Sequence, residues 1–219
     1  MNIYVNKAQR LLKNVSYRLR IRNRNFSLVS QNCVGGVMYN FLGMEFLSPT
    51  INMFIEDMNF VKLAEDPKYY FGIDAKPYIE NYHDPIDNSI TYPQIIIDDV
   101  IINCLHYKSC DEACTAWNRR RLRVNYDNIF FIGNSWNMHE NYELVDRIAA
   151  LPYSIVFTYQ KSEKDNCIWL KDQFWKLDNR GIIRPNITDS VPNSGLKYFE
   201  KYFDYVNWLN KRIKHFRTE

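Results

Sequence analysis

The stretch FSLVSQNCVGGVMYNFLG, residues Phe26 to Gly43, decides the fold class of this chain. It reads as a short apolar strand, a polar turn that contains Cys33, a pair of glycines and then a helix. In α/β proteins the residues that follow such a strand meet ligands at the carboxyl edge of a sheet. The stretch therefore predicts a strand-turn-helix unit with a thiol or an anion-binding turn at its centre.

Cys33 is expected at or just before the first turn of that helix. Unpaired backbone N–H groups and the helix dipole favour an anion there and lower the pKa of a thiol. Gly35 and Gly36 would let a ligand approach the backbone closely. A free cysteine is also often a buried small hydrophobe. The amides of Gln31 and Asn32 before it and the glycine pair after it favour the functional reading.

Apolar strands and helical patterns alternate along the rest of the chain, which predicts a mostly parallel or mixed sheet flanked by helices. At 219 residues and 46% hydrophobic content the chain can bury one core, so we expect a single, three-layer, Rossmann-like α/β domain. The expected strands lie near residues 95–105, which form one or two strands, and near residues 129–132 and 155–159. The expected helices lie near residues 57–65, 109–124, 141–150 and 196–216, the last packing on the domain.

An amphipathic, basic helix is predicted within residues 1–24, because Leu11, Leu12, Val15 and Leu19 recur there at helical spacing. We expect this stripe to pack on the domain, with a membrane surface or a partner synthase as the alternative. The chain contains no apolar run of about 18 residues and no signal-peptide core. We therefore expect a cytoplasmic protein, either free or peripheral to the inner face of the membrane.

The charge and cysteine content exclude several classes of protein. Because 28 basic and 25 acidic residues leave a net charge of only +3, no nucleic-acid partner is expected. Five cysteines, an odd number in a reducing compartment, do not suggest a disulfide framework. Cys110 and Cys114 lack a second pair of ligands at a convincing spacing, so these cysteines do not predict a zinc site.

Four groups of residues follow the predicted strands and would meet at one sheet edge. Cys33 and His106, from two of these groups, form a sufficient nucleophile and base if they meet, because an imidazole can take the proton of a thiol. A histidine at a strand end can equally be structural, and sequence separation does not decide between the two. The groups are residues 31–33, His106 with Tyr107, residues 133–136 including Asn134, and residues 158–161.

Charged side chains beside apolar positions are further candidates. Trp117 and Arg121 share one face of the helix near residues 109–124, and we expect Arg120 or Arg121 to face inward and bind a phosphate or carboxylate. The other arginines fit a solvated basic helix end. Asp98 and Asp99 interrupt an apolar run. They mark either a metal or sugar site or the turn between two strands.

The stretch that contains Cys33, the segments SPT-x-NMFI and YPQIIIDD, and the run LHYKSCDEACTAWNRRRLRVNYDNIFFI resemble a bacterial exopolysaccharide-biosynthesis family, domain of unknown function 1919. The resemblance covers about residues 26–174. Its most specific motifs are N-C-x-G-G and H-Y-x-S-x-x-E-A-x-x-x-W-x-x-R. The family positions that carry over are Asn32, Cys33, Gly35, Gly36, His106, Tyr107, Glu112, Trp117 and Arg120.

This resemblance implies a Rossmann-like fold and a cytoplasmic step in capsule or exopolysaccharide assembly. We expect a transferase that modifies a sugar or sugar-phosphate precursor, with acetyl-CoA or a nucleotide sugar as donor and acyl transfer favoured. The rivals are a sugar-nucleotide glycosyltransferase that uses Asp98 and Asp99, and a non-catalytic module that binds a glycan precursor or a synthase. The predicted catalytic residues are Cys33 and His106, and the predicted substrate-binding residues are Asn32, Gly35, Gly36, Tyr107, Trp117, Arg120, Arg121 and Asn134.

Overall fold

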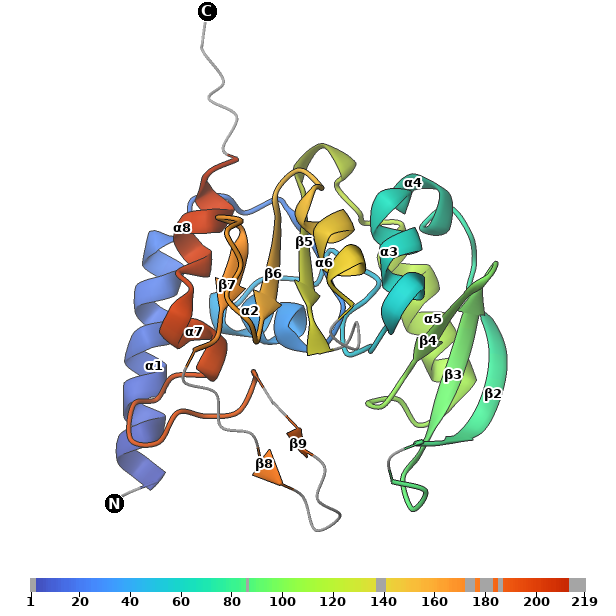
Figure 1. Cartoon of the computed structure of the whole chain (residues 1–219), viewed down its shortest axis with the longest axis horizontal. Coiled ribbons are helices and arrows are strands. Elements are labelled where there is room, and N and C mark those ends of the chain that lie inside the picture. The colour runs from blue at the N-terminus through green and yellow to red at the C-terminus, as the bar shows by residue number, and fades with distance from the viewer. Residues whose placement is uncertain are drawn as a thin grey trace, which may run out of the picture.

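A four-stranded parallel sheet forms the centre of the computed structural model (Figure 1). Its strands stand in the order β1-β5-β6-β7, and the register of β1 with β5 sets Leu28 opposite Phe130. The strands are β1 (Ser27–Ser30), β5 (Ile129–Asn134), β6 (Ser154–Thr158) and β7 (Cys167–Trp169). The structure describes residues 3–85, 87–136, 141–171, 176–177, 183–184 and 187–212.

Alternate residues of each central strand face opposite layers of the molecule. Phe130 and Ile132 join one hydrophobic cluster with residues of α2, α7 and α8. Ile129 and Phe131 join the other, with residues of α3, α5 and α6. Because successive strand residues point to opposite faces, this alternation confirms the expected α/β fold. The helices are α2 (Val34–Leu42), α3 (Asp57–Glu65), α4 (Pro67–Tyr70), α5 (Cys110–Arg121), α6 (Tyr142–Ala149), α7 (Tyr198–Tyr202) and α8 (Tyr205–Asn210).

A separate antiparallel sheet, β2-β3-β4, lies beside the parallel one (Figure 1). The expectation that residues 95–105 belong to the central sheet is wrong. Asp98 adopts a φ of 52°, a conformation that aspartate tolerates in tight turns, and the chain folds back so that Ile97 pairs with Val100. The strands are β2 (Lys76–His83), β3 (Thr91–Ile97) and β4 (Val100–Asn103), and the short elements elsewhere are η1 (Tyr126–Asn128), β8 (Lys176–Leu177) and β9 (Ile183–Arg184).

Asp98 and Asp99 lie in the β3–β4 turn, as one of the two readings of these residues predicts. Tyr69 donates its hydroxyl hydrogen to Asp98 at 2.8 Å. Asp99 accepts from Lys62 at 2.6 Å and from Tyr70 at 3.0 Å. These hydrogen bonds hold the pKa of the Asp99 carboxyl below its ordinary value. Both aspartates therefore mark a turn and are engaged in surface contacts.

The N-terminal helix α1 (Ile3–Arg20) attaches through a different face from the expected one. Its leucine stripe does not pack on the domain: Leu12 is 70% exposed and Leu19 is 81% exposed. The contacts come instead from Tyr17, whose ring lies 5.2 Å from that of Tyr205, and from Arg10, which binds Glu200. Helical spacing defined the apolar face correctly, but it could not say which face meets the core.

The C-terminal segment also differs from expectation. In place of one helix over residues 196–216, the chain forms α7 and α8, because Phe203 between them has an extended backbone (φ −143°, ψ 118°). Phe199 of α7 and Leu209 of α8 are fully buried, so the segment does pack on the domain. Residues 213–216 of the expected helix lie outside the described residues.

Candidate functional site

Cys33 and His106 meet at the carboxyl edge of β1. The Cys33 Sγ lies 3.2 Å from the Nε2 of His106, a distance at which a thiol and an imidazole share a hydrogen bond. Cys33 is the residue before α2, whereas His106 stands in the loop between β4 and α5. The two predicted catalytic residues are therefore in contact, brought together from loops that follow strands of two different sheets.

The environment of Cys33 combines a helix terminus with burial. Asn32 accepts a hydrogen bond from the backbone N–H of Val34 at 3.2 Å, and so caps the first turn of α2. Burial of the Cys33 thiol raises its pKa above the ordinary value, although a backbone hydrogen bond opposes the shift. The expectation of a lowered pKa is wrong, because desolvation outweighs the helix terminus. The thiol needs a base at neutral pH, and His106 is in place to act as one.

The loop that carries His106 is held by its neighbour. The hydroxyl of Tyr107 donates to the carbonyl of Ile51 at 3.0 Å. Arg120 donates from one nitrogen, Nη1, to that hydroxyl at 2.6 Å and to the same carbonyl at 3.2 Å. Because Ile51 packs beside the N-terminal half of α2, this triangle ties the histidine loop to the cysteine helix. Tyr107 and Arg120 therefore anchor the loop that carries His106.

Arg120 is the inward-facing arginine that we expected. It is only 9% exposed, and its guanidinium carbon lies 5.6 Å from the ring centroid of Phe46. Among the residues that the structure describes, no carboxylate forms an ion pair with it. A buried cation without a counter-ion is costly, and a bound anion would offset that cost.

The two glycines of α2 make close contacts with the protein itself. A Cβ added to Gly35 would lie 2.7 Å from the Cβ of Ser30. One added to Gly36 would lie 3.2 Å from Asn52 Oδ1 and 3.3 Å from a methyl of Ile51. The close approach that we expected from a ligand is therefore made by β1 and by the segment around residues 51–52. Direct substrate binding by either glycine stays a prediction.

The remaining predicted residues are not gathered around the pair. Trp117 is fully buried in the core, where its indole N–H donates to the carbonyl of Ile73 at 3.3 Å. Arg121 binds Asp74 at 2.9 Å on the surface. Asn134 does lie at the sheet edge, where its side-chain oxygen accepts from the N–H of Trp136 at 2.8 Å. Trp117 and Arg121 thus have structural partners in place of a ligand.

Gln31 belongs to the group of residues 31–33 that the sequence placed at the sheet edge, but it was not among the predicted catalytic or substrate-binding residues. Its side-chain oxygen accepts from the backbone N–H of Asn134 at 2.9 Å, and its backbone N–H donates to the carbonyl of Ile132 at 3.0 Å. Its side-chain nitrogen is buried and, like the hydroxyls of Ser30 and Thr158, has no partner among the described residues. Its position directly after β1 is the feature of the sequence that indicates a place at the sheet edge. Unpaired buried polar atoms call for water or a ligand.

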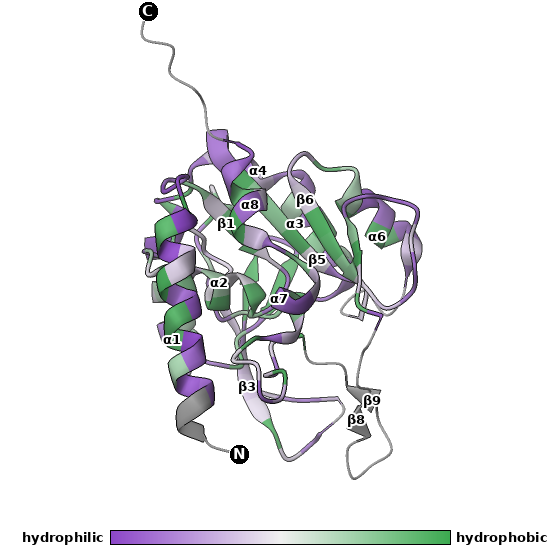
Figure 2. Cartoon of the chain, turned by 90° about the vertical axis from the view of Figure 1, so that its left-hand side faces the viewer, coloured by the Kyte–Doolittle hydropathy of each residue, from purple (hydrophilic) through white to green (hydrophobic). Residues whose placement is uncertain are grey.

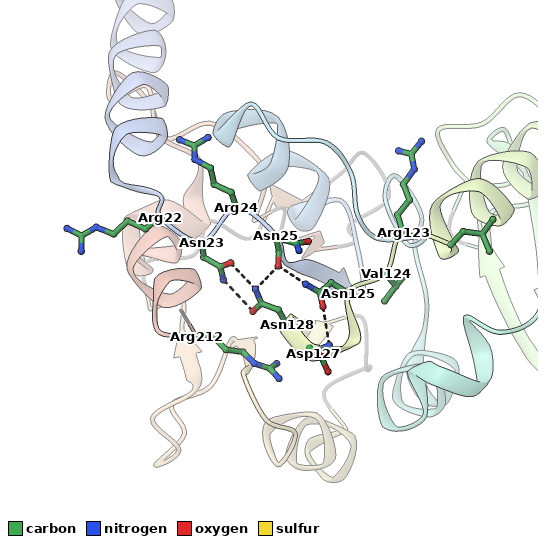
Figure 3. Close-up of a pocket in the computed structure, with 11 residues that line it drawn as sticks. Arg22, Asn23, Arg24, Asn25, Arg123, Val124, Asn125, Asp127, Asn128 and Arg212 are labelled. Atoms are coloured by element: carbon green, nitrogen blue, oxygen red, sulfur yellow. Dashed lines mark hydrogen bonds between the residues drawn. The ribbon is translucent and has the colours of Figure 1, made fainter. Parts of the chain in front are cut away.

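A pocket lies at the opposite, amino edge of the sheet, and the amide side chains that line it bind one another and the backbone (Figure 3). Asn128 donates to the side chain of Asn23 at 2.8 Å and to the carbonyl of Asn25 at 2.6 Å. Figure 3 shows Arg22 and Arg24 pointing away from these amides. The amides join the segment before β1 to the turn before β5, so we do not assign a ligand to this pocket.

Comparison with known proteins identifies relatives but no activity. The family described as "Domain of unknown function (DUF1919)" matches residues 4–210. A protein of Haemophilus influenzae, described as "Uncharacterized protein", is 26% identical over 210 residues, which is 94% of each chain. The match spans both Cys33 and His106 and nearly every described element.

Proposed function

We propose that this chain, which belongs to the family described as domain of unknown function (DUF1919), catalyses cysteine-dependent acyl transfer. The acceptor in this proposal is a sugar or sugar-phosphate precursor. The observation that carries the proposal is the 3.2 Å contact between Cys33 Sγ and His106 Nε2. It supports a nucleophile that is deprotonated by an adjacent base as it attacks.

The first half of the reaction loads the enzyme. His106 Nε2 takes the proton of the Cys33 thiol as the sulfur attacks the carbonyl carbon of an acyl thioester, such as acetyl-CoA. The bond from the carbonyl carbon to the thiol of the donor breaks. That thiol leaves with the proton from His106, and the acyl group remains on Cys33 as a thioester.

The second half transfers the acyl group. His106 takes the proton of a sugar hydroxyl, whose oxygen attacks the thioester carbonyl of acylated Cys33. The C–S bond breaks, the proton returns to the sulfur, and an O-acylated sugar leaves.

The anionic character of the proposed substrate follows from Arg120. This buried cation, which has no carboxylate partner among the described residues, gives the region around Tyr107 and Ile51 a positive potential. A phosphate on the sugar or on the acyl donor would be attracted there. The setting that we propose is capsule or exopolysaccharide synthesis, because the motifs around Cys33 and His106 resemble a family described in that context.

The glycosyltransferase alternative has less support. Asp98 and Asp99, the carboxylates on which it depends, are occupied by Tyr69, Lys62 and Tyr70 at a surface turn. The described residues contain no group of three or more His, Cys, Asp or Glu side chains that could hold a metal ion. We therefore favour acyl transfer.

The test is to trap the acyl-enzyme. The purified chain would be incubated with acetyl-CoA and analysed by intact-protein mass spectrometry, in parallel with Cys33→Ala, His106→Gln and the matched control Cys167→Ala. We expect a single acetyl adduct in the parent and in the control, none in Cys33→Ala and at least about tenfold slower labelling in His106→Gln.

Two outcomes would contradict the proposal. Equal labelling of Cys33→Ala and the parent would show that Cys33 is not the nucleophile. Absence of an adduct across a panel of acyl thioesters, together with stabilisation of the fold by a nucleotide sugar, would favour glycosyl transfer or glycan binding instead.

A further inference from the structure

The outer face of α1 carries four exposed apolar side chains. Leu11, Leu12, Val15 and Leu19 are 63%, 70%, 46% and 81% exposed. At 100° per residue these four side chains fall within an arc of roughly 100° on the helix. Hydrophobic residues are visible along α1 in Figure 2. A continuous apolar stripe of this kind marks an interaction surface, whereas single exposed leucines are ordinary.

The fold does not need these leucines, because the ring of Tyr17 and several polar contacts hold α1 in place. Arg10 binds Glu200, and its guanidinium lies 4.0 Å from the ring centroid of Phe41. Arg18 donates to the carbonyl of Phe41 at 3.1 Å, and Arg20 forms an ion pair with Asp204. The helix thus presents its polar side to the domain and its apolar side outward, the reverse of an ordinary surface helix.

The charge of the N-terminal segment restricts what can cover the stripe. The first acidic residue of the chain is Glu45, whereas residues 7–24 contain Lys7, Arg10, Lys13, Arg18, Arg20, Arg22 and Arg24. Two copies of such a helix would bring like charges together. An anionic surface would complement them, and a lipid surface would also take the leucines.

We propose that α1 docks this protein on an anionic lipid bilayer, lying in the plane of the interface with Leu11, Leu12, Val15 and Leu19 among the acyl chains. Lys7 is exposed and flanks one side of the apolar arc, within reach of the headgroups, whereas Arg18 and Arg20 at the edges of the arc hold the helix to the domain. None of the described helices is long and apolar enough to cross a membrane, which fits a helix that lies on the surface. This inference does not rest on the proposed activity.

The test is co-sedimentation with vesicles. The full chain would be mixed with vesicles of phosphatidylcholine alone or of phosphatidylcholine with phosphatidylglycerol. The variants would be Leu12→Ser/Leu19→Ser and the matched control Leu122→Ser, whose leucine is 76% exposed on a different helix end. We expect binding to the anionic vesicles that weakens with added salt, a loss of at least about tenfold in the double variant and no loss in the control.

Thermal unfolding of each variant would show that the chain still folds, and size-exclusion chromatography with light scattering would give the oligomeric state. Equal binding by the double variant and the parent would overturn the proposal, as would no binding to anionic vesicles. A dimer of the parent that the double variant loses, without vesicle binding, would assign the stripe to a second copy.

Discussion

His106 Nε2 reaches Cys33 Sγ at 3.2 Å from the end of an antiparallel strand, while the cysteine itself follows a parallel one. The contact exists because Phe54 and Asn103 exchange backbone hydrogen bonds of 2.9 Å, which dock β4 beside the segment that follows α2. The proposed nucleophile and its proposed base thus follow strands of two separate sheets, which the backbone bridge between Phe54 and Asn103 joins.

Alkylation of Cys33 should depend on pH. Because burial raises the pKa of the Cys33 thiol, the fraction of thiolate is small at neutral pH and grows as pH rises above about 8.5, the ordinary value. We expect the rate of iodoacetamide labelling, followed by mass spectrometry of the Cys33 peptide, to keep rising through pH 9. A plateau of that rate below pH 7 would show a preformed thiolate.

Loss of the hydroxyl at Tyr107 should lower both the stability of the fold and the rate of Cys33 acylation. Tyr107→Phe removes the hydroxyl that donates to the carbonyl of Ile51 and accepts from Arg120. This loss should lower the free energy of unfolding by about 1–3 kcal/mol. Because the loop that carries His106 is then released, the rate of Cys33 acylation should fall by a larger factor than the folding equilibrium constant. The control is Arg119→Ala, at an exposed position of α5, the helix that carries Arg120. It should change neither the midpoint of urea unfolding nor the acylation rate.

Gly35→Ala should destabilise the fold through a clash with β1. The new methyl would lie 2.7 Å from the Cβ of Ser30, and overpacking of this kind costs about 1–3 kcal/mol. Ser30→Gly removes that Cβ, so the double variant should be more stable than the sum of the two single effects. Additive unfolding free energies in urea would show that the contact is unimportant.

Stability should fall as pH rises from about 8.5 to about 10. Burial raises the pKa of Cys114 to about 11 and raises the pKa values of Cys104 and Cys110. The unfolded chain loses these protons near pH 8.5 while the folded chain keeps them, so each thiol contributes a slope of up to about −1.4 kcal/mol per pH unit. Cys114→Ala should make the decline of unfolding free energy with pH shallower, and an unchanged slope would contradict this assignment.

Local pattern was enough to predict the strand-turn-helix unit around Cys33 and the sheet flanked by helices. Apolar runs and glycine pairs act through backbone preferences and alternate burial, which neighbouring residues determine. The same reasoning identified Cys33 and His106 as candidates, since both follow strands. It could not give their distance, because that depends on how β4 docks beside α2.

Tertiary structure alone decided which faces are buried. Arg120 and Arg121 are adjacent and identical, yet Arg120 is 9% exposed and contacts Tyr107, whereas Arg121 binds Asp74 at the surface. Helical spacing likewise defined the leucine stripe of α1 without saying that it faces outward. Sequence periodicity specifies a face of a helix, but the partner that the face meets comes from packing between segments far apart in the chain.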